Sequence, residues 1–70
     1  MKSAKFTRCV DFDNDLDTLK GWFGANYDYN DRCPAMFCIT MHAINNFTQQ
    51  EQDDITALAA ANFLMVEFIF

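Results

Sequence analysis

The sequence predicts a single α+β domain over residues 1–70, a small three-stranded sheet with two helices in the order strand, helix, strand, helix, strand. Three observations lead there. The chain is 51% hydrophobic and 16% aromatic, three segments alternate or run apolar as strands do, and two segments show helical spacing after a capping residue. A domain of this length removes only about 60% of its unfolded surface from water, so its core must be dense. Aromatic side chains, which bury about 150–250 Å² each, make that possible.

The first predicted strand covers residues 5–12. Its side chains alternate, with Phe6, Val10 and Phe12 on one side and Lys5, Thr7 and Asp11 on the other. This period of two is typical of a half-buried strand.

The first predicted helix follows directly. Asp13, Asn14 or Asp15 is expected to cap it by accepting its free backbone N–H groups. Leu16, Leu19 and Phe23 then recur at helical spacing, and Gly24 is the expected stop.

Residues 25–32 are predicted to form a loop, because Asn and Asp side chains there hydrogen-bond readily to their own backbone. Residues 35–44 favour a second strand, with one alternating set of Phe37, Ile39, Met41 and Ala43 and another of Met36, Cys38, Thr40 and His42. A helix beginning at Pro34 is the alternative, since proline is well tolerated in a first turn.

The second helix is the clearest element in the sequence. Thr48 and Glu51 form a capping box, in which each side chain accepts from the other residue's backbone N–H. Ile55, Leu58 and Ala59 then share one face. Residues 63–70 are rich in strand formers. They place Leu64, Val66, Phe68 and Phe70 on one face and Phe63, Met65, Glu67 and Ile69 on the other. Two apolar faces imply a central strand or a surface covered by a partner.

The cysteines and acids do not predict a metal or a cofactor. Cys9, Cys33 and Cys38 are an odd number in a chain without a recognisable leader, so buried reduced thiols are expected rather than disulfides. A zinc site would show tighter ligand pairs. The alternating aspartates from Asp11 onward resemble a calcium loop, but Leu16 and Trp22 stand where such a loop needs Gly and Glu.

His42 is the chain's one histidine and is expected to share a strand face with Cys38 and Thr40. Residues two apart on one strand project in parallel, and no orienting carboxylate is identifiable from the sequence. We therefore predict a partly buried structural histidine and no enzymatic activity. No apolar stretch reaches the roughly 18 residues of a membrane span, so a soluble, cytoplasmic protein is expected.

The charges are strongly segregated. All five cations lie in the first 32 residues, whereas residues 33–70 contain four acids and no Lys or Arg, and the net charge is −5. At helix starts, aspartates can serve simply as caps that meet the helix dipole. A negative field also repels nucleic acid and attracts basic protein surfaces.

In length, acid surplus and lack of a legible active site, the chain resembles the small acidic inhibitors encoded by phages, the anti-CRISPR proteins and related DNA mimics. This resemblance is one of type and involves no diagnostic motif. It implies a protein of the host-cell cytoplasm whose carboxylates occupy the Lys/Arg cleft of a bacterial defence nuclease complex, such as a CRISPR effector subunit, and so block DNA recognition. It implies no direct contact with nucleic acid or membrane.

The candidate partner-binding residues are the acids and the aromatic residues near them. They are Asp11, Asp13, Asp15, Asp17, Asp28, Asp31, Glu51, Asp53, Asp54, Trp22, Tyr27 and Tyr29. Aromatic residues are included because they are enriched at interface hot spots. The alternative function is a structural or interaction module that forms homodimers through an apolar sheet face.

Overall fold

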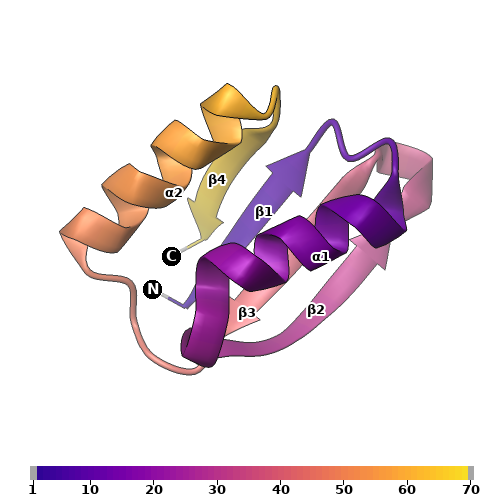
Figure 1. The fold of residues 1–70 in the computed structure, drawn as a ribbon. Helices are drawn as coiled ribbons and strands as arrows, with labels where there is room; N and C mark the ends of the chain where they lie inside the picture. The colour runs from indigo at the N-terminus through magenta and orange to yellow at the C-terminus, as the bar shows by residue number, and fades with distance from the viewer. Residues whose placement is uncertain (1, 70) are drawn as a thin grey trace.

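A computed structural model describes residues 2–69 as one antiparallel sheet with two helices on a single face (Figure 1). The elements are β1 (Ser3–Thr7), α1 (Phe12–Phe23), the 3₁₀ turn η1 (Gly24–Asn26), β2 (Tyr27–Cys33), the 3₁₀ turn η2 (Pro34–Met36), β3 (Cys38–Ala43), α2 (Gln49–Ala61) and β4 (Met65–Ile69). The strand order is β2-β3-β1-β4. The α+β class and the two helices are confirmed, but the described sheet has four strands rather than three.

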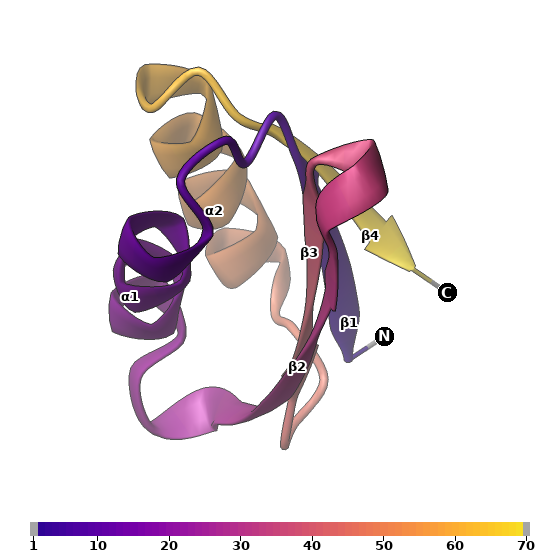
Figure 2. The ribbon, with the colours of Figure 1, turned by 90° about the vertical axis from the view of Figure 1, so that its right-hand side faces the viewer.

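The core lies between the helices and the inner face of the sheet. Figure 2 views the sheet edge-on, with α1 and α2 on one side and the other side uncovered by either helix. Ala4, Phe6, Ile39 and Met41 point inward from the two central strands and are fully buried. The helices cover them with apolar residues spaced three or four apart, Leu16, Leu19 and Phe23 from α1 and Ile55 and Ala59 from α2.

Aromatic rings join α1 and the segment before α2 to the sheet. Phe6 meets Trp22 and Phe23 edge to face, at centroid distances of 6.0 and 6.3 Å. Phe47, in the segment before α2, does the same with Phe23 at 5.5 Å and with Phe68 of β4 at 5.3 Å. Such pairs contribute beyond their buried area, which offsets the small size of the domain.

The first strand is shorter than predicted, and the first helix has a different cap. β1 ends at Thr7 because Arg8 adopts a left-handed backbone (φ 71°), and Val10 is 78% exposed rather than inward-facing. Asp11, not Asp13, Asn14 or Asp15, caps α1. Its carboxylate accepts from the Asn14 N–H, while the Asp15 carboxylate accepts from the Asp11 N–H at 3.3 Å. Gly24, with φ 55°, ends the helix as predicted.

The predicted loop at residues 25–32 is wrong, because most of it forms β2. This strand is at the sheet edge and pairs only with β3, so its side chains need not be apolar on either face. A register shift between Tyr27 and Tyr29 further interrupts its alternation. Period-two hydrophobicity, the signal used for the other strands, is therefore absent from its sequence.

The strand predicted at residues 35–44 and the helix predicted after Thr48 are both confirmed in type. Residues 38–43 form β3, with Ile39, Met41 and Ala43 buried, and the alternative helix at Pro34 is reduced to the short turn η2. The capping box of α2 is present, with Glu51 N to Thr48 Oγ1 at 3.1 Å and Thr48 N to Glu51 Oε1 at 2.9 Å.

The last strand, β4, directs Val66 and Phe68 to the core but lies at the sheet edge, not at its centre. The predicted role of Phe70 lies outside the described residues. Within residues 2–69 no helix combines the length and apolar character needed to cross a membrane.

Candidate functional site

A groove of about 200 Å³ lies between the end of α1 and the start of α2. Its lining is aromatic and aliphatic with two carboxylates, namely Trp22, Phe23, Asn26, Phe47, Glu51, Asp54, Ile55 and Leu58. The antiparallel course of the two helices, visible in Figure 1, brings the C-terminal half of α1 beside the N-terminal half of α2. The groove thus has Trp22, which is half-buried, on its α1 side, and Glu51, Asp54 and the 40% exposed Leu58 on its α2 side.

Local hydrogen bonds hold the groove carboxylates in place. Glu51 accepts from the Thr48 N–H in the capping box, and Asp54 accepts from the Gln50 side-chain amide at 2.8 Å. Each carboxylate can accept about four hydrogen bonds, so each keeps capacity for a ligand. Glu51 lies in the first turn of α2, where the helix dipole stabilises negative charge, and Asp54 lies one turn further along the helix.

Among residues 2–69, no Lys or Arg side chain lines this groove. The Lys20 amine instead lies over the Tyr27 ring, 5.3 Å from its centroid, and Arg32 pairs with Asp13 on α1. Because residues 33–70 contain no Lys or Arg at all, the negative charge of α2 has no basic neighbour in its own half of the chain.

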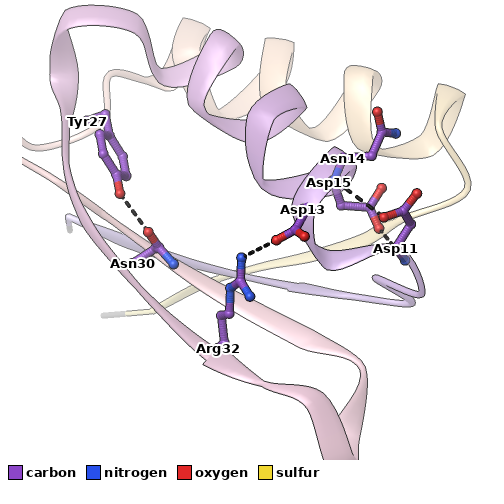
Figure 3. A network of polar contacts seen from close by, with 7 residues as sticks. All are labelled: Asp11, Asp13, Asn14, Asp15, Tyr27, Asn30 and Arg32. Atoms are coloured by element: carbon purple, nitrogen blue, oxygen red, sulfur yellow. Dashed lines mark hydrogen bonds and ion pairs between the residues drawn. The ribbon is translucent and has the colours of Figure 1, made fainter.

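The acids at the start of α1 are in a different situation. Figure 3 shows Arg32 reaching from β2 to Asp13, and the contacts of Asp11 with Asn14 and Asp15. The Arg32 Nη2 and Asp13 Oδ1 atoms are 2.8 Å apart. These carboxylates cap the helix or form an ion pair. Asp13 is nevertheless 91% exposed, so the pair is a surface one, in which screening by water keeps the interaction weak.

On the outward face of the sheet, the side chains of neighbouring strands line up in three rows. Each row begins on β2, the strand that the sequence analysis missed. From β2 through β3 and β1 to β4, the rows are Tyr29, His42, Ser3 and Ile69; Asp31, Thr40, Lys5 and Glu67; and Cys33, Cys38, Thr7 and Met65. Most of these residues are polar. Neighbours within a row on one face lie close enough to interact.

His42 has an orienting carboxylate, contrary to the sequence-based reading. Its Nε2 is 2.8 Å from Asp31 Oδ2, its Nδ1 is 2.8 Å from Ser3 Oγ, and the Tyr29 ring stacks on it at 4.2 Å and 14°. A carboxylate only accepts, so Nε2 carries a hydrogen, and in the neutral imidazole Nδ1 then accepts from the Ser3 hydroxyl. The partly buried position expected for His42 is confirmed, with its side chain 20% exposed.

The row of Tyr29, His42 and Ser3 links β2, β3 and β1 through side-chain contacts. A nucleophilic serine would also need donors aimed at a developing oxyanion. Ser3 instead lies in a strand paired on both sides, where backbone N–H groups serve the sheet. The contacts with Ser3, Asp31 and Tyr29 therefore fix the orientation of the imidazole.

The three thiols differ in their surroundings. Cys9 is fully buried and donates to the Phe6 carbonyl at 3.5 Å, and burial together with the Asp15 charge raises its pKa to about 11. Burial and a hydrogen bond with the Cys33 side chain raise the pKa of Cys38. Cys33 is half-buried. Across residues 2–69, no three His, Cys, Asp or Glu side chains are grouped so as to hold a metal ion.

The predicted partner-binding residues do not form one surface. Trp22, Glu51 and Asp54 meet in the groove, whereas Asp53 points elsewhere on α2 and accepts from Gln49. Tyr27 packs on the core and donates to Asn30 at 2.6 Å (Figure 3).

The remaining predicted residues lie outside the groove. Tyr29 and Asp31 are on the outward sheet face, and Asp17 and Asp28 are exposed on α1 and β2. The sequence analysis missed five groove residues, namely Phe23, Asn26, Phe47, Ile55 and Leu58. The apolar ones among them carry only the signal of core residues in the sequence.

Comparison with known proteins gave no match. No family model, curated protein or solved structure is similar to this chain.

Proposed function

We propose that this domain binds a basic surface of another protein through the groove between α1 and α2. The observation that supports this is the lining itself, in which an aromatic floor adjoins Glu51 and Asp54 and no cation is present. Lys and Arg side chains suit such a site, because their stems pack on apolar surface while the charged head pairs with carboxylates or an aromatic ring. Arg adds bidentate pairing with a carboxylate.

The partner class that fits best is a protein whose basic surface handles DNA. A cleft that neutralises phosphates presents closely spaced Lys and Arg side chains, and a fixed pair of carboxylates can engage them in the same way. In this form of the proposal the domain is an inhibitor that occupies the DNA-binding surface of a bacterial defence nuclease complex. The net charge of −5 and the acids around the groove add long-range attraction.

The alternative of a homodimer through an apolar sheet face stays a prediction. Its premise was two apolar faces on the last strand. Outward apolar side chains are present on β4, where Met65 and Ile69 are exposed, but β1 and β3 present Ser3, Thr40 and other polar groups beside them. No observation of the outward face favours dimerisation over binding at the groove.

The test is direct binding to purified CRISPR effector complexes, measured by biolayer interferometry across a range of salt concentrations, with target DNA as competitor. The proposal expects binding that excludes DNA and weakens steeply as salt rises. The double variant Glu51→Gln/Asp54→Asn should lose tenfold or more in affinity. Gln at position 51 is compatible with a capping box, so the helix start is preserved.

Asp53→Asn is the matched control, because it removes one charge from the same helix turn outside the groove. It should bind within about twofold of the wild type, in line with the weak effect of one screened surface charge. Binding that leaves the complex able to hold DNA, or that is indifferent to salt, would contradict the proposed partner surface. An equal loss in Asp53→Asn would show that net charge, not the groove, governs binding.

A further inference from the structure

Cys33 and Cys38 form a directly opposed cross-strand pair. Cys33 is the last residue of β2, Cys38 is the first of β3, and the two are register partners across the short turn η2. Both side chains project from the outward face, as the end row of the sheet. The Cys38 thiol lies 3.9 Å from the Cys33 carbonyl oxygen.

The backbone spacing of such a pair matches that of a disulfide. Opposed residues of antiparallel strands have Cα atoms about 4.5–5.5 Å apart. A disulfide bridges Cα atoms about 4.4–6.8 Å apart. The Cys38 thiol points back across the strand pair to Cys33, since it donates to the Cys33 carbonyl oxygen.

The turn between the two cysteines is held independently of them. Phe37, in the left-handed region at φ 52°, donates its N–H to the Pro34 carbonyl at 3.1 Å, and its own carbonyl accepts from the Cys9 N–H at 2.9 Å. The strand ends are therefore already positioned before any covalent link forms. This preorganisation favours an intramolecular reaction over a second intermolecular one.

The two sulfurs differ in access. Cys33 is half-buried, so a small reagent can reach its sulfur, whereas Cys38 is 4% exposed and best placed to react with Cys33 itself. Cys9 is fully buried beneath the sheet and donates to Phe6. The geometry thus assigns an attacking, a resolving and an unreactive thiol.

We propose that Cys33 and Cys38 are a dithiol site that exchanges with low-molecular-weight disulfides. The Cys33 thiolate attacks one sulfur of the small disulfide, forms a mixed disulfide and releases one small thiol. The Cys38 thiolate then attacks the Cys33 sulfur and releases the second thiol, leaving a Cys33–Cys38 disulfide. Two electrons pass from the protein dithiol to the small disulfide. The two protons that the protein thiols lose to solvent are balanced by the two that the released small thiolates take up to become thiols.

The sequence offers a clean readout. Trypsin cuts after Arg32 and finds no later Lys or Arg, so residues 33–70 form one peptide that contains both reacting cysteines. Cys9 falls in a separate peptide, residues 9–20. The folded domain would be incubated with oxidised glutathione at mildly alkaline pH and freed of excess reagent by gel filtration at acidic pH. It would then be unfolded in guanidinium chloride, so that every remaining thiol can be alkylated with iodoacetamide, digested and analysed by mass spectrometry.

The expected product is a 33–70 peptide two hydrogens lighter than the reduced one, with alkylation lost from both of its cysteines and kept on Cys9. Dithiothreitol should restore both alkylations. Cys38→Ser should stop at a glutathione adduct on Cys33, Cys33→Ser should stay unmodified, and Cys9→Ser should behave as the wild type.

Three results would overturn the assignment. They are a persistent glutathione adduct on wild-type Cys33, a link between the 9–20 and 33–70 peptides, and full alkylation of all three cysteines after oxidation. Circular dichroism of each variant, taken before oxidation, ensures that the thiols compared belong to folded protein.

Discussion

The two faces of the sheet are built on different principles. The inner face is apolar, and Ala4, Phe6, Ile39 and Met41 are each fully buried beneath the helices. The outward face is largely polar, and its order comes from specific pairs such as His42 with Asp31 and with Tyr29. The hydrophobic effect, which does not depend on orientation, stabilises the inner face. Hydrogen bonds and ring stacking, which do depend on orientation, fix the side chains of the outward face.

This difference locates stability and recognition in different parts of the molecule. Because the core is closely packed, a buried inner-face side chain cannot be shortened without leaving a cavity. Outward residues and Asp54 can change with less effect on folding than inner-face residues, and they are therefore positions where a surface can acquire a function. Four predictions measure how sharp this contrast is.

The largest effect is expected at Phe6, the ring that contacts both Trp22 and Phe23. Phe6→Ala should lower the free energy of unfolding by about 3–5 kcal/mol, since it removes a buried ring and leaves a cavity. The matched control is Lys5→Ala, one residue earlier on the outward face, which should change it by less than about 0.5 kcal/mol. Urea unfolding of both variants checks this. Comparable losses at the two positions would remove the contrast between the faces.

The second effect is a loss of stability at high pH from Cys9. Burial raises its pKa from the ordinary value of 9.0 to about 11 in the folded protein. The folded state thus favours the neutral thiol, so its contribution is complete below about pH 9 and is lost as the pH rises toward 11. The loss should reach about 2–3 kcal/mol.

Cys9→Ser isolates this contribution, because its hydroxyl can still donate to the Phe6 carbonyl but does not titrate in this range. Unfolding curves between pH 8 and pH 11 should fall less steeply for the variant than for the wild type. Parallel curves would show that ionisation of Cys9 is not linked to folding.

The same contrast explains which parts of the fold the sequence predicts. Inner-face positions leave a periodic signal, so β1, β3, β4 and both helices are recognisable from apolar spacing and from the Thr48 capping box. The edge strand β2 leaves none. Its residues Asp28, Asn30 and Asp31 have the composition of a loop, and only pairing with β3 makes them a strand.

The missed strand also concealed the surroundings of His42. Asp31 and Tyr29 contact the imidazole only because β2 pairs with β3 in one register, a relation between residues far apart in sequence. The groove is likewise only partly predictable from the sequence. Trp22 and the α2 acids stand out as residues, but their convergence depends on how the helices cross the sheet. The position of β4 at the edge, too, follows from topology and not from its own composition.

The third prediction concerns the outward face itself. Tyr29 stacks on His42 with ring centroids 4.2 Å apart, and Tyr29 is 52% exposed. A double-mutant cycle with Tyr29→Ala and His42→Ala should give a coupling energy of about 0.5–1.5 kcal/mol. Urea unfolding of the wild type, both single variants and the double variant supplies the four values. Additive losses would mean that the stacked rings do not stabilise the pairing of β2 with β3.

The smallest effect is expected for the ion pair between Asp13 and Arg32. The two groups are 2.8 Å apart, but their side chains are 91% and 42% exposed, so water screens the attraction. The coupling energy from Asp13→Asn and Arg32→Gln should be below about 0.5 kcal/mol and should vanish at high salt. A coupling of 1 kcal/mol or more in the same unfolding assay would mean that β2 is anchored to α1 by charge. The edge strand would then depend on the helix layer as well as on its pairing with β3.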